Sequence, residues 1–351
     1  MPRGSAPGCP VTDPAGAFHA SNTDAHARVV HTEMRLTIVI CTHNRTALLG
    51  RTLRYLNESR RPTRCDVDIV VVANGCTDGT HDLLMRYMNA RDGLPLRWQV
   101  EPTPGKSHAL NRALPLIQAD WAAFVDDDHR VDASYLQSIV EATRAHPEAD
   151  IFCGRILPDW DGTEPAWVHD TGAYRIYPLP VPRYDLGDVP NASPQDIAIP
   201  GGGNIIVRGS LLAKVGRFST DLGPVAGSLG GAEDYDWVER AIASGARLQY
   251  VPGIVQYHYA DPDRLTTRYV VEKAYERSAS VVRVSAANTG DARVPRYMVR
   301  KVARHLYLLA FGAFDPTKRR FHLVRLAASA GEVKGRLQAQ LDLKRSASRS
   351  R

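Results

Sequence analysis

The chain has 351 residues, enough for one large domain with an appendage or for two domains. With 44% hydrophobic and 23% charged residues, its composition is that of a soluble globular protein. No apolar run reaches the ~18–20 residues that span a bilayer. Five cysteines without a CxxC spacing argue against a disulfide framework or a zinc site, so we expect reduced thiols and a cytoplasmic protein.

The net charge of +6 is unevenly distributed along the chain. Residues 318–351 contain ten Lys or Arg against two acidic residues, a net charge of +8, which leaves −2 for residues 1–317. Such a basic segment can contact an anionic membrane surface, or it can simply be solvated. Its one aromatic residue, Phe321, offers no stacking platform for single strands, so we expect no nucleic-acid partner.

Strand-like and helix-like segments alternate after a leader that is rich in Pro, Gly, Ala and Ser. Apolar runs predict strands at 36–41, 69–73, 96–100 and 121–125, and apolar residues at helical spacing predict helices at 48–56, 107–117 and 134–145. Continuous apolar strands separated by helices favour an α/β fold. We therefore expect a mainly parallel central sheet flanked by helices.

Polar residues follow the ends of three of these predicted strands. Thr42, Asn44 and Arg45 follow the first strand, Asn74 the second, and the triplet Asp126–Asp128 the fourth. Ligands of such sheets bind beyond the carboxyl ends of the strands, so one nucleotide-type site is predicted. Three adjacent carboxylates repel one another and are hard oxygen ligands, which suits Mn²⁺ or Mg²⁺. A solvated acidic turn is the alternative.

Two candidate groups lie further along the chain. Glu233 and Asp234 open a predicted helix over 235–244, where exposed amides would keep a carboxylate ionised for a general base; an N-cap pair is the alternative. His258 follows a strand-like run at 248–255 and is either a metal ligand or a hydrogen-bonded hinge residue.

Less regular segments surround these groups. Residues 157–200 contain eight prolines and several aromatics, and we interpret them as an acceptor-side insertion or lid. Beyond residue 260 the pattern is helical, with an apolar stripe at Met298, Val302, Leu306 and Leu309. This stripe could pack in a core, form a homodimer interface or lie on a membrane.

Six segments of the chain, in order, carry recognisable motifs: Thr37–Arg45 (TIVICTHNR), Val70–Thr80 (VVVANGCTDGT), Gly105–Ala113 (GKSHALNRA), Phe124–Asp128 (FVDDD), Gly203–Phe218, and Glu233–Arg240 (EDYDWVER). Each motif alone is a weak signal. The ordered set resembles the bacterial inverting family-two glycosyltransferases of the GT-A fold, over roughly residues 36–258. Ala73 departs from the pattern, because relatives usually have an acidic residue there that contacts the nucleotide base. Asn74 could supply that hydrogen bond instead.

The resemblance implies transfer of a sugar, by single displacement with inversion, from a nucleotide-sugar donor to a hydroxyl or amine. A UDP-sugar is favoured as donor, with GDP- and dTDP-sugars as alternatives, and the acceptor is a saccharide, a lipid-linked molecule or a natural product. The implied residues are Asp234 as base with Glu233 beside it; Thr42, Asn44, Arg45, Asn74, Lys106, Asp126 and Asp127 for the donor; Gly203, Asn204 and Trp237 on the acceptor side; and Asp126, Asp128 and His258 for Mn²⁺ or Mg²⁺.

The implied organisation has four parts: a flexible leader (1–34), a catalytic domain (35–260, donor half 35–130 and acceptor half 131–260), a helical extension (261–317) and a basic, partly disordered tail (318–351). We expect a cytoplasmic enzyme, with contact at the inner membrane face through the tail as an open alternative. Two other functions remain open. A nucleotidyltransferase would leave the Glu233–Asp234 segment unexplained, and intact carboxylate motifs argue against a non-catalytic binding protein.

Overall fold

The computed structural model describes residues 34–90, 92–190, 202–220, 233–289, 291–311 and 314–349. The chain divides after Glu33, so the predicted leader lies almost wholly outside the described residues. The strands are β1 (Met34–Thr42), β2 (Cys65–Asn74), β3 (Leu96–Glu101), β4 (Trp121–Phe124), β5 (His129–Val131), β6 (Ile151–Asp159), β7 (Ile205–Arg208) and β8 (Leu248–Tyr259). The helices are α1 (Thr46–Glu58), α2 (Thr80–Ala90), α3 (Lys106–Ala113), α4 (Tyr135–Ala145), α5 (Gly209–Val215), α6 (Glu233–Ala243), α7 (Thr267–Thr289), α8 (Arg296–Phe311) and α9 (Pro316–Arg349).

The strands of the described residues form one mixed sheet in the order β3-β2-β1-β4-β7-β6-β8-β5. The four strands predicted from apolar runs are confirmed, and they pair in parallel in one half of the sheet. In the other half β7 runs antiparallel to both β4 and β6, and β5 runs antiparallel to β8. The sheet is therefore mixed, and the predicted α/β fold with flanking helices is confirmed.

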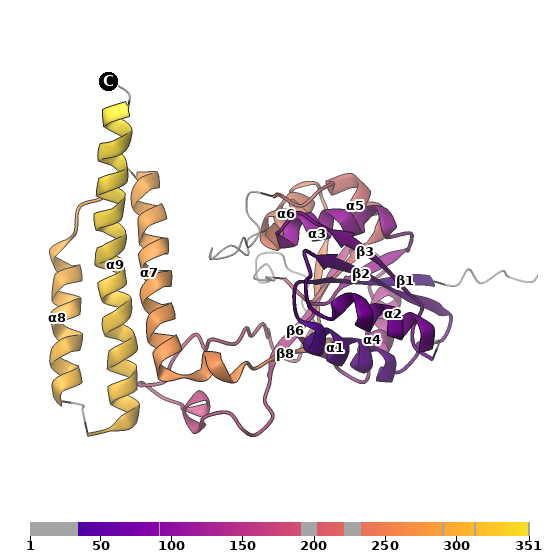
Figure 1. Ribbon diagram of the computed structural model, residues 1–351, viewed down its shortest axis with the longest axis horizontal. Helices are drawn as coiled ribbons and strands as arrows, with labels where there is room; N and C mark the ends of the chain where they lie inside the picture. The colour runs from indigo at the N-terminus through magenta and orange to yellow at the C-terminus, as the bar shows by residue number, and fades with distance from the viewer. Residues whose placement is uncertain are drawn as a thin grey trace, which may run out of the picture. The chain divides into compact units, whose positions relative to one another are not determined.

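Helices cover both faces of this sheet, as Figure 1 shows. On one face, α1, α2 and α4 contribute buried side chains such as Leu53, Leu84 and Ile139. On the other face, α3, α5 and α6 contribute residues such as Leu110 and Trp237. Because the strands are covered on both sides, successive strand residues are buried, which explains their continuous apolar runs.

The predicted disorder of the basic tail is wrong for residues 318–349. This segment belongs to α9, which packs against both α7 and α8. Gly331 and Gly335 bring the backbones of α9 and α7 together, since a Cβ at either position would collide with the α7 backbone. Ion pairs from Arg283 of α7 to Asp342 of α9 and from Lys301 of α8 to Glu332 of α9 also join these helices. Small residues and paired charges thus order a segment whose composition is typical of a solvated tail.

Two other sequence predictions concern packing. Of the apolar stripe on α8, Met298 is buried, but Leu306 is 58% exposed. In the described part of the 157–200 insertion, Trp167 packs in a cluster with Val270, beside Phe321 of α9. That aromatic residue therefore stabilises the junction with the C-terminal helices. No helix in the described ranges is both long enough and apolar enough to cross a membrane.

Candidate active site

The carboxylate triplet lies directly after β4, beside the end of β1, and its three side chains have different partners. Asp127 is buried and accepts hydrogen bonds from the Thr42 hydroxyl at 2.7 Å and from Arg45 at 2.9 Å. Asp128 accepts a second bond from Arg45 at 2.8 Å. Asp126 instead pairs with Lys106 at 3.0 Å. Protein cations therefore offset the repulsion that the sequence predicts for three adjacent carboxylates.

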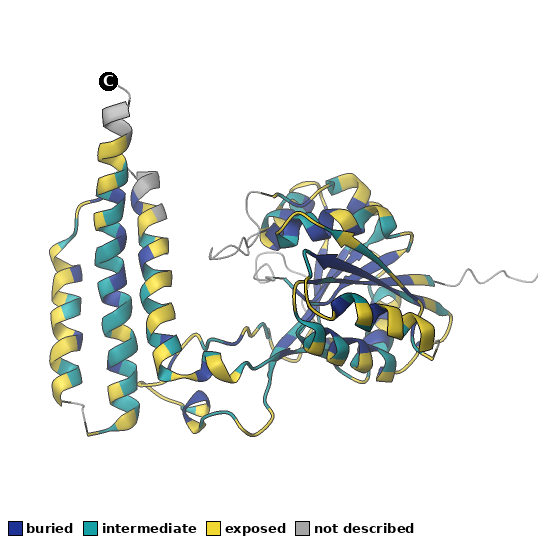
Figure 2. Cartoon of the chain, viewed as in Figure 1, coloured by how far each residue is buried: buried dark blue, intermediate teal, exposed yellow. Residues whose placement is uncertain are grey.

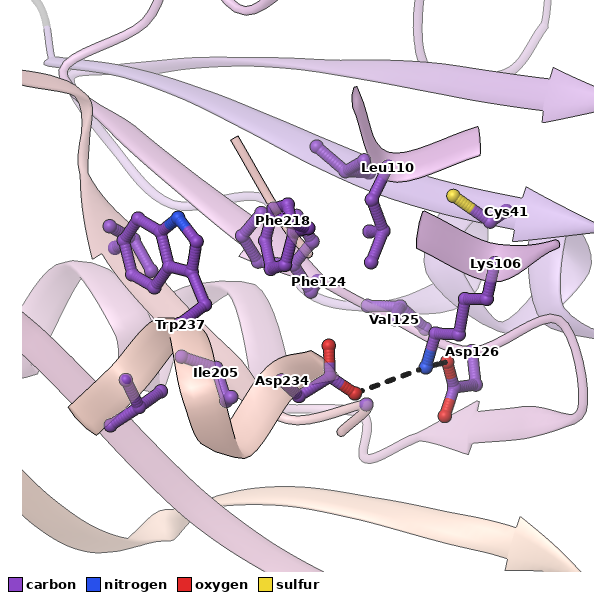
Figure 3. A pocket seen from close by; sticks show the side chains of 14 residues that line it. Cys41, Lys106, Leu110, Phe124, Val125, Asp126, Ile205, Phe218, Asp234 and Trp237 are labelled. Atoms are coloured by element: carbon purple, nitrogen blue, oxygen red, sulfur yellow. Dashed lines mark hydrogen bonds and ion pairs between the residues drawn. The ribbon is translucent and has the colours of Figure 1, made fainter. Parts of the chain in front are cut away.

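Lys106 connects the triplet with the start of α6, as Figure 3 shows. Its Nζ lies 3.0 Å from Asp126 Oδ1, 3.4 Å from Asp234 Oδ2 and 4.0 Å from Glu233 Oε1. These carboxylates come from segments more than a hundred residues apart. Lys106, Asp126, Gly203 and Asp234 all line the same pocket. The structure therefore brings the predicted donor and base residues together around one cation.

Burial changes the acidity of this cluster. It raises the pKa of Glu233 to about 7, with the Asp234 charge adding to the effect and Lys106 opposing it. Burial also raises the pKa of Asp234, again against Lys106. At Asp126, burial acts in the same direction, but the charge and hydrogen bond of Lys106, together with the nearby His129 and His258, outweigh it and hold the pKa below its ordinary value. Burial therefore acts on Asp234 in the opposite direction to the effect expected from the amides of the helix N-terminus, which favour the ionised carboxylate.

A second cluster lies on the other side of the triplet, where β5 pairs with β8 and His129 lies opposite His258. One ligand atom each of Asp128, His129 and His258 lies within 4.8 Å of the other two. The Nε2 atoms of His129 and His258 are 3.9 and 3.7 Å from the Asp128 carboxylate. Of the three residues predicted to bind metal, Asp128 and His258 are thus together, while Asp126 is engaged by Lys106.

Hydrogen bonds fix the tautomers of both imidazoles in a form that can bind a metal. Gln256 Nε2 donates to the Phe124 carbonyl oxygen, so its Oε1 is left to accept from His129 Nδ1 at 2.5 Å. His258 Nδ1 donates to the Tyr259 carbonyl oxygen at 2.7 Å. The lone pairs therefore lie on the Nε2 atoms, which face Asp128, and buried His129 Nε2 has no hydrogen-bond partner among the described residues. Two imidazoles and a carboxylate with anchored outer nitrogens fit a divalent cation such as Mn²⁺.

Several predicted donor residues have structural partners. Thr42 and Arg45 bind Asp127, as described above, and so support the triplet. Asn44 Oδ1 accepts the Thr77 amide at 2.7 Å. Asn74 donates both amide hydrogens to the carbonyl oxygens of Glu101 and Thr103 and accepts from the Gly105 amide. No hydrogen of Asn74 is left for a nucleotide base, and its role in this structure is to hold the loop before Lys106.

The predicted acceptor-side residues Gly203, Asn204 and Trp237 also have structural roles. Gly203 has a φ of +77°, and a Cβ there would lie 2.7 Å from Asp126 Oδ2, so it allows the backbone to approach the triplet. Asn204 is fully buried and bonds to Gln256 and to two backbone carbonyls. Trp237 is 1% exposed, stacks on Phe218 and donates its indole hydrogen to Gly216. Asn204 and Trp237 are therefore interior supports and have no free polar atom for an acceptor.

Sequence reasoning missed two residues of this site, His129 and Gln256. His129 directly follows the triplet, and that adjacency was the available signal. Gln256 lies two residues before His258, so on β8 the two side chains share a face of the strand. Its burial and its bonds to His129 and Tyr135 come from the packing of β8, which the sequence pattern does not specify.

Comparisons with known proteins bear on the family and the fold of the chain. Residues 37–215, just over half of the chain, match the family described as "Glycosyl transferase family 2". A lipopolysaccharide core biosynthesis glycosyltransferase, LpsC, from Rhizobium meliloti is 33% identical over 110 residues, 31% of this chain and 37% of that protein. A validoxylamine A glucosyltransferase from Streptomyces hygroscopicus subsp. jinggangensis is 33% identical over 122 residues, 34% of this chain and 28% of that protein. The chain thus matches well under half the length of these relatives.

Among solved structures, a mannosyltransferase from Pyrobaculum calidifontis, PcManGT, superimposes with a TM-score of 0.52 at 19% identity. The match covers 86% of this chain and 87% of that one, and at this identity it concerns the fold alone. The family match covers the motifs from β1 to α5. The chain therefore belongs to glycosyl transferase family 2 and has the GT-A fold.

Proposed function

We propose that the chain is a metal-dependent, inverting glycosyltransferase, and that it transfers a sugar from a nucleotide-sugar donor in a single displacement with Asp234 as the base. The observation that carries the proposal is the position of Asp126 and Asp234 on either side of Lys106, at 3.0 and 3.4 Å. A donor diphosphate near the triplet and an acceptor near α6 would then meet beside the Lys106 ammonium group. The family match favours glycosyl transfer over the nucleotidyltransferase and the non-catalytic alternatives.

In the proposed reaction, the acceptor oxygen or nitrogen forms a bond to the anomeric carbon while the bond from that carbon to the diphosphate oxygen breaks. The proton of the attacking group passes to Asp234, and the bonding electron pair leaves with the diphosphate. The raised pKa of Asp234 supports this role, because a base of higher pKa has a greater affinity for the proton. Lys106 lies where its charge would stabilise the leaving group. One base and one displacement imply inversion.

Asp128, His129 and His258 would hold the divalent cation, which supplies Lewis-acid neutralisation of the diphosphate. The orphaned, buried His129 Nε2 supports this assignment. Arg45 already bonds to Asp127 and Asp128, so it would keep the triplet in place when the cation is absent. Glu233, the neighbour of Asp234 in the chain, is 1% exposed and has a pKa raised to about 7, and we assign it a positioning role.

The donor and the domain boundaries are also part of the proposal. The sequence favours a UDP-sugar as donor, with GDP- and dTDP-sugars as alternatives, and the complex of the Pyrobaculum neighbour with GDP-Man and Mn²⁺ supports the GDP-sugar alternative. The acceptor is a saccharide, a lipid-linked molecule or a natural product. We place the catalytic domain at residues 35–260, with the donor half ending at residue 130, followed by the C-terminal helices.

The test is a thermal-shift screen of UDP-, GDP- and dTDP-sugars, each with Mn²⁺, with Mg²⁺ and with chelator. A ligand at a hundred times its Kd stabilises the folded state by about 2.7 kcal/mol, which is readily measured. We expect one nucleotide class to raise the Tm, and only when a divalent cation is present. Stabilisation that is equal with chelator would contradict the metal assignment.

A further inference from the structure

The face of α8 that points away from α9 carries exposed apolar side chains. Tyr297, Leu306, Tyr307 and Phe311 are 58%, 58%, 60% and 71% exposed. Figure 2 shows this helix with a largely exposed outer face. Just beyond the helix, Phe314 is 99% exposed. Exposed aromatic and aliphatic residues in this density on one helix mark an interaction surface.

These residues are not part of the packing that holds the helices together. The opposite face of α8 supplies the buried Met298 and His305, and α9 is the helix that α8 contacts most. Met298 and His305 are seven residues apart and so lie on one side of the helix, whereas Tyr307 and Phe311 lie on the other. The exposed apolar side chains are therefore free for a partner outside the described chain.

The positive charge of α8 and its flanking residues indicates an anionic partner. From Ala292 to Phe314 there are five basic residues and no acidic residue. Lys301 is paired with Glu332 of α9. Arg296, Arg300 and Arg304 are exposed on the same face as Tyr307 and Phe311, and none of the three has an ion pair within the described residues. The outer face of α8 is thus apolar and cationic at once.

We propose that the outer face of α8, formed by Arg296, Arg300, Arg304, Leu306, Tyr307 and Phe311, docks on an anionic lipid bilayer. An amphipathic helix with aromatic and aliphatic residues among basic ones lies in the membrane interface, where the arginines meet headgroup phosphates and the apolar side chains enter the acyl boundary. A second copy of the chain is a poorer occupant. A two-fold interface would set this acid-free face against itself and bring like charges together. The basic segment predicted for membrane contact is residues 318–351, and its described part belongs to α9, which packs against α7 and α8.

The test is co-sedimentation of the full chain with vesicles that contain phosphatidylglycerol and with vesicles of phosphatidylcholine alone. We expect binding to the anionic vesicles only, weakened by salt. Arg300→Gln combined with Arg304→Gln should weaken this binding about 30-fold, since each basic residue near such a surface contributes about a factor of five. Leu306→Ser combined with Phe311→Ser should weaken it as well, and should leave a residual binding that salt abolishes.

The matched control is Lys273→Gln combined with Arg277→Gln, which removes two exposed charges from α7. We expect this control to bind within about two-fold of wild type, since the attraction acts close to the membrane surface. All substituted side chains are exposed, and an unchanged Tm verifies folding. The proposal is overturned if the wild-type protein does not bind anionic vesicles. It is also overturned if the control variant loses as much vesicle affinity as the α8 variants. It is also overturned if light scattering shows a dimer that Leu306→Ser with Phe311→Ser converts to monomer, because the face would then bind a second copy.

Discussion

Replacing Asp234 with Asn is the most direct test of the proposed chemistry. The substitution keeps the size of the side chain, which matters because Gly202 lies tightly against Asp234 Oδ2, where a Cβ would come within 2.7 Å. An amide oxygen can still face Lys106, now 3.4 Å from Asp234. The variant loses only the charge and the ability to accept a proton. Loss of a general base costs about 10²–10⁴-fold in rate, or about 3–5 kcal/mol in the barrier.

Donor binding should change far less than transfer. Lys106 keeps its closer partner, Asp126, at 3.0 Å, and among the described residues no hydrogen bond or ion pair joins Asp234 to Asp128, His129 or His258. We therefore expect donor affinity within a few-fold of wild type while transfer to the acceptor collapses. The assay is single-turnover transfer, measured beside a calorimetric donor titration in the same buffer.

Asp236→Asn is the matched control. Asp236 lies in the same first turn of α6, but it pairs with Arg240 at 3.0 Å and does not line the pocket. Its variant should transfer at nearly the wild-type rate. Near-normal transfer by Asp234→Asn, or an equal loss in both variants, would refute the assignment of the base and move it to Glu233 or elsewhere.

Three further predictions follow from the same cluster. Asp128→Ala should abolish the Mn²⁺-dependent part of donor stabilisation while the protein stays folded, and a Tm increment equal to wild type would contradict the metal assignment. The folded-state pKa of Glu233 is raised from 4.5 to about 7, so its burial destabilises the fold increasingly as the pH rises through this window. The gain in the free energy of unfolding from Glu233→Gln, measured against wild type, should therefore be about 2–3 kcal/mol larger at pH 8 than at pH 4.5. A gain that does not change with pH would contradict the raised pKa of Glu233. Gly203→Ala should disturb Asp126 and slow transfer, whereas Gly162→Ala, with a similar φ of +86° but open space around it, should show backbone strain alone and normal kinetics.

The first half of the fold followed directly from residue patterns. The apolar run at 69–73 lies inside β2, and the run at 121–125 covers β4, because strands covered on both faces have no polar positions. The helix at 134–145 is α4, whose buried Leu136, Ile139 and Val140 recur at helical spacing. These are local signals, and no knowledge of partners is needed to read them.

Local residue patterns did not predict the antiparallel part of the sheet or the helical structure of the C-terminal segment. β5 has three residues and owes its existence to pairing with β8. The segment 318–349 has the composition of a solvated tail, yet Gly331 and Gly335 let it pack closely on α7. Such contacts depend on which segments meet, and composition does not contain that information.

For the site, the sequence by itself determined the chemical types and their order: a carboxylate triplet after β4, a lysine at the start of α3, and a carboxylate pair at the start of α6. Only the tertiary structure decided which carboxylates pair with the lysine, since Lys106 and Asp234 are 128 residues apart in the chain and lie 3.4 Å apart in space. It also gave Asn74 and Asn204 partners in the interior of the protein and placed His129 beside the proposed metal ligands Asp128 and His258. The physical reason is that a residue's type limits the bonds it can make, whereas the partners that packing places within reach decide which bonds it does make.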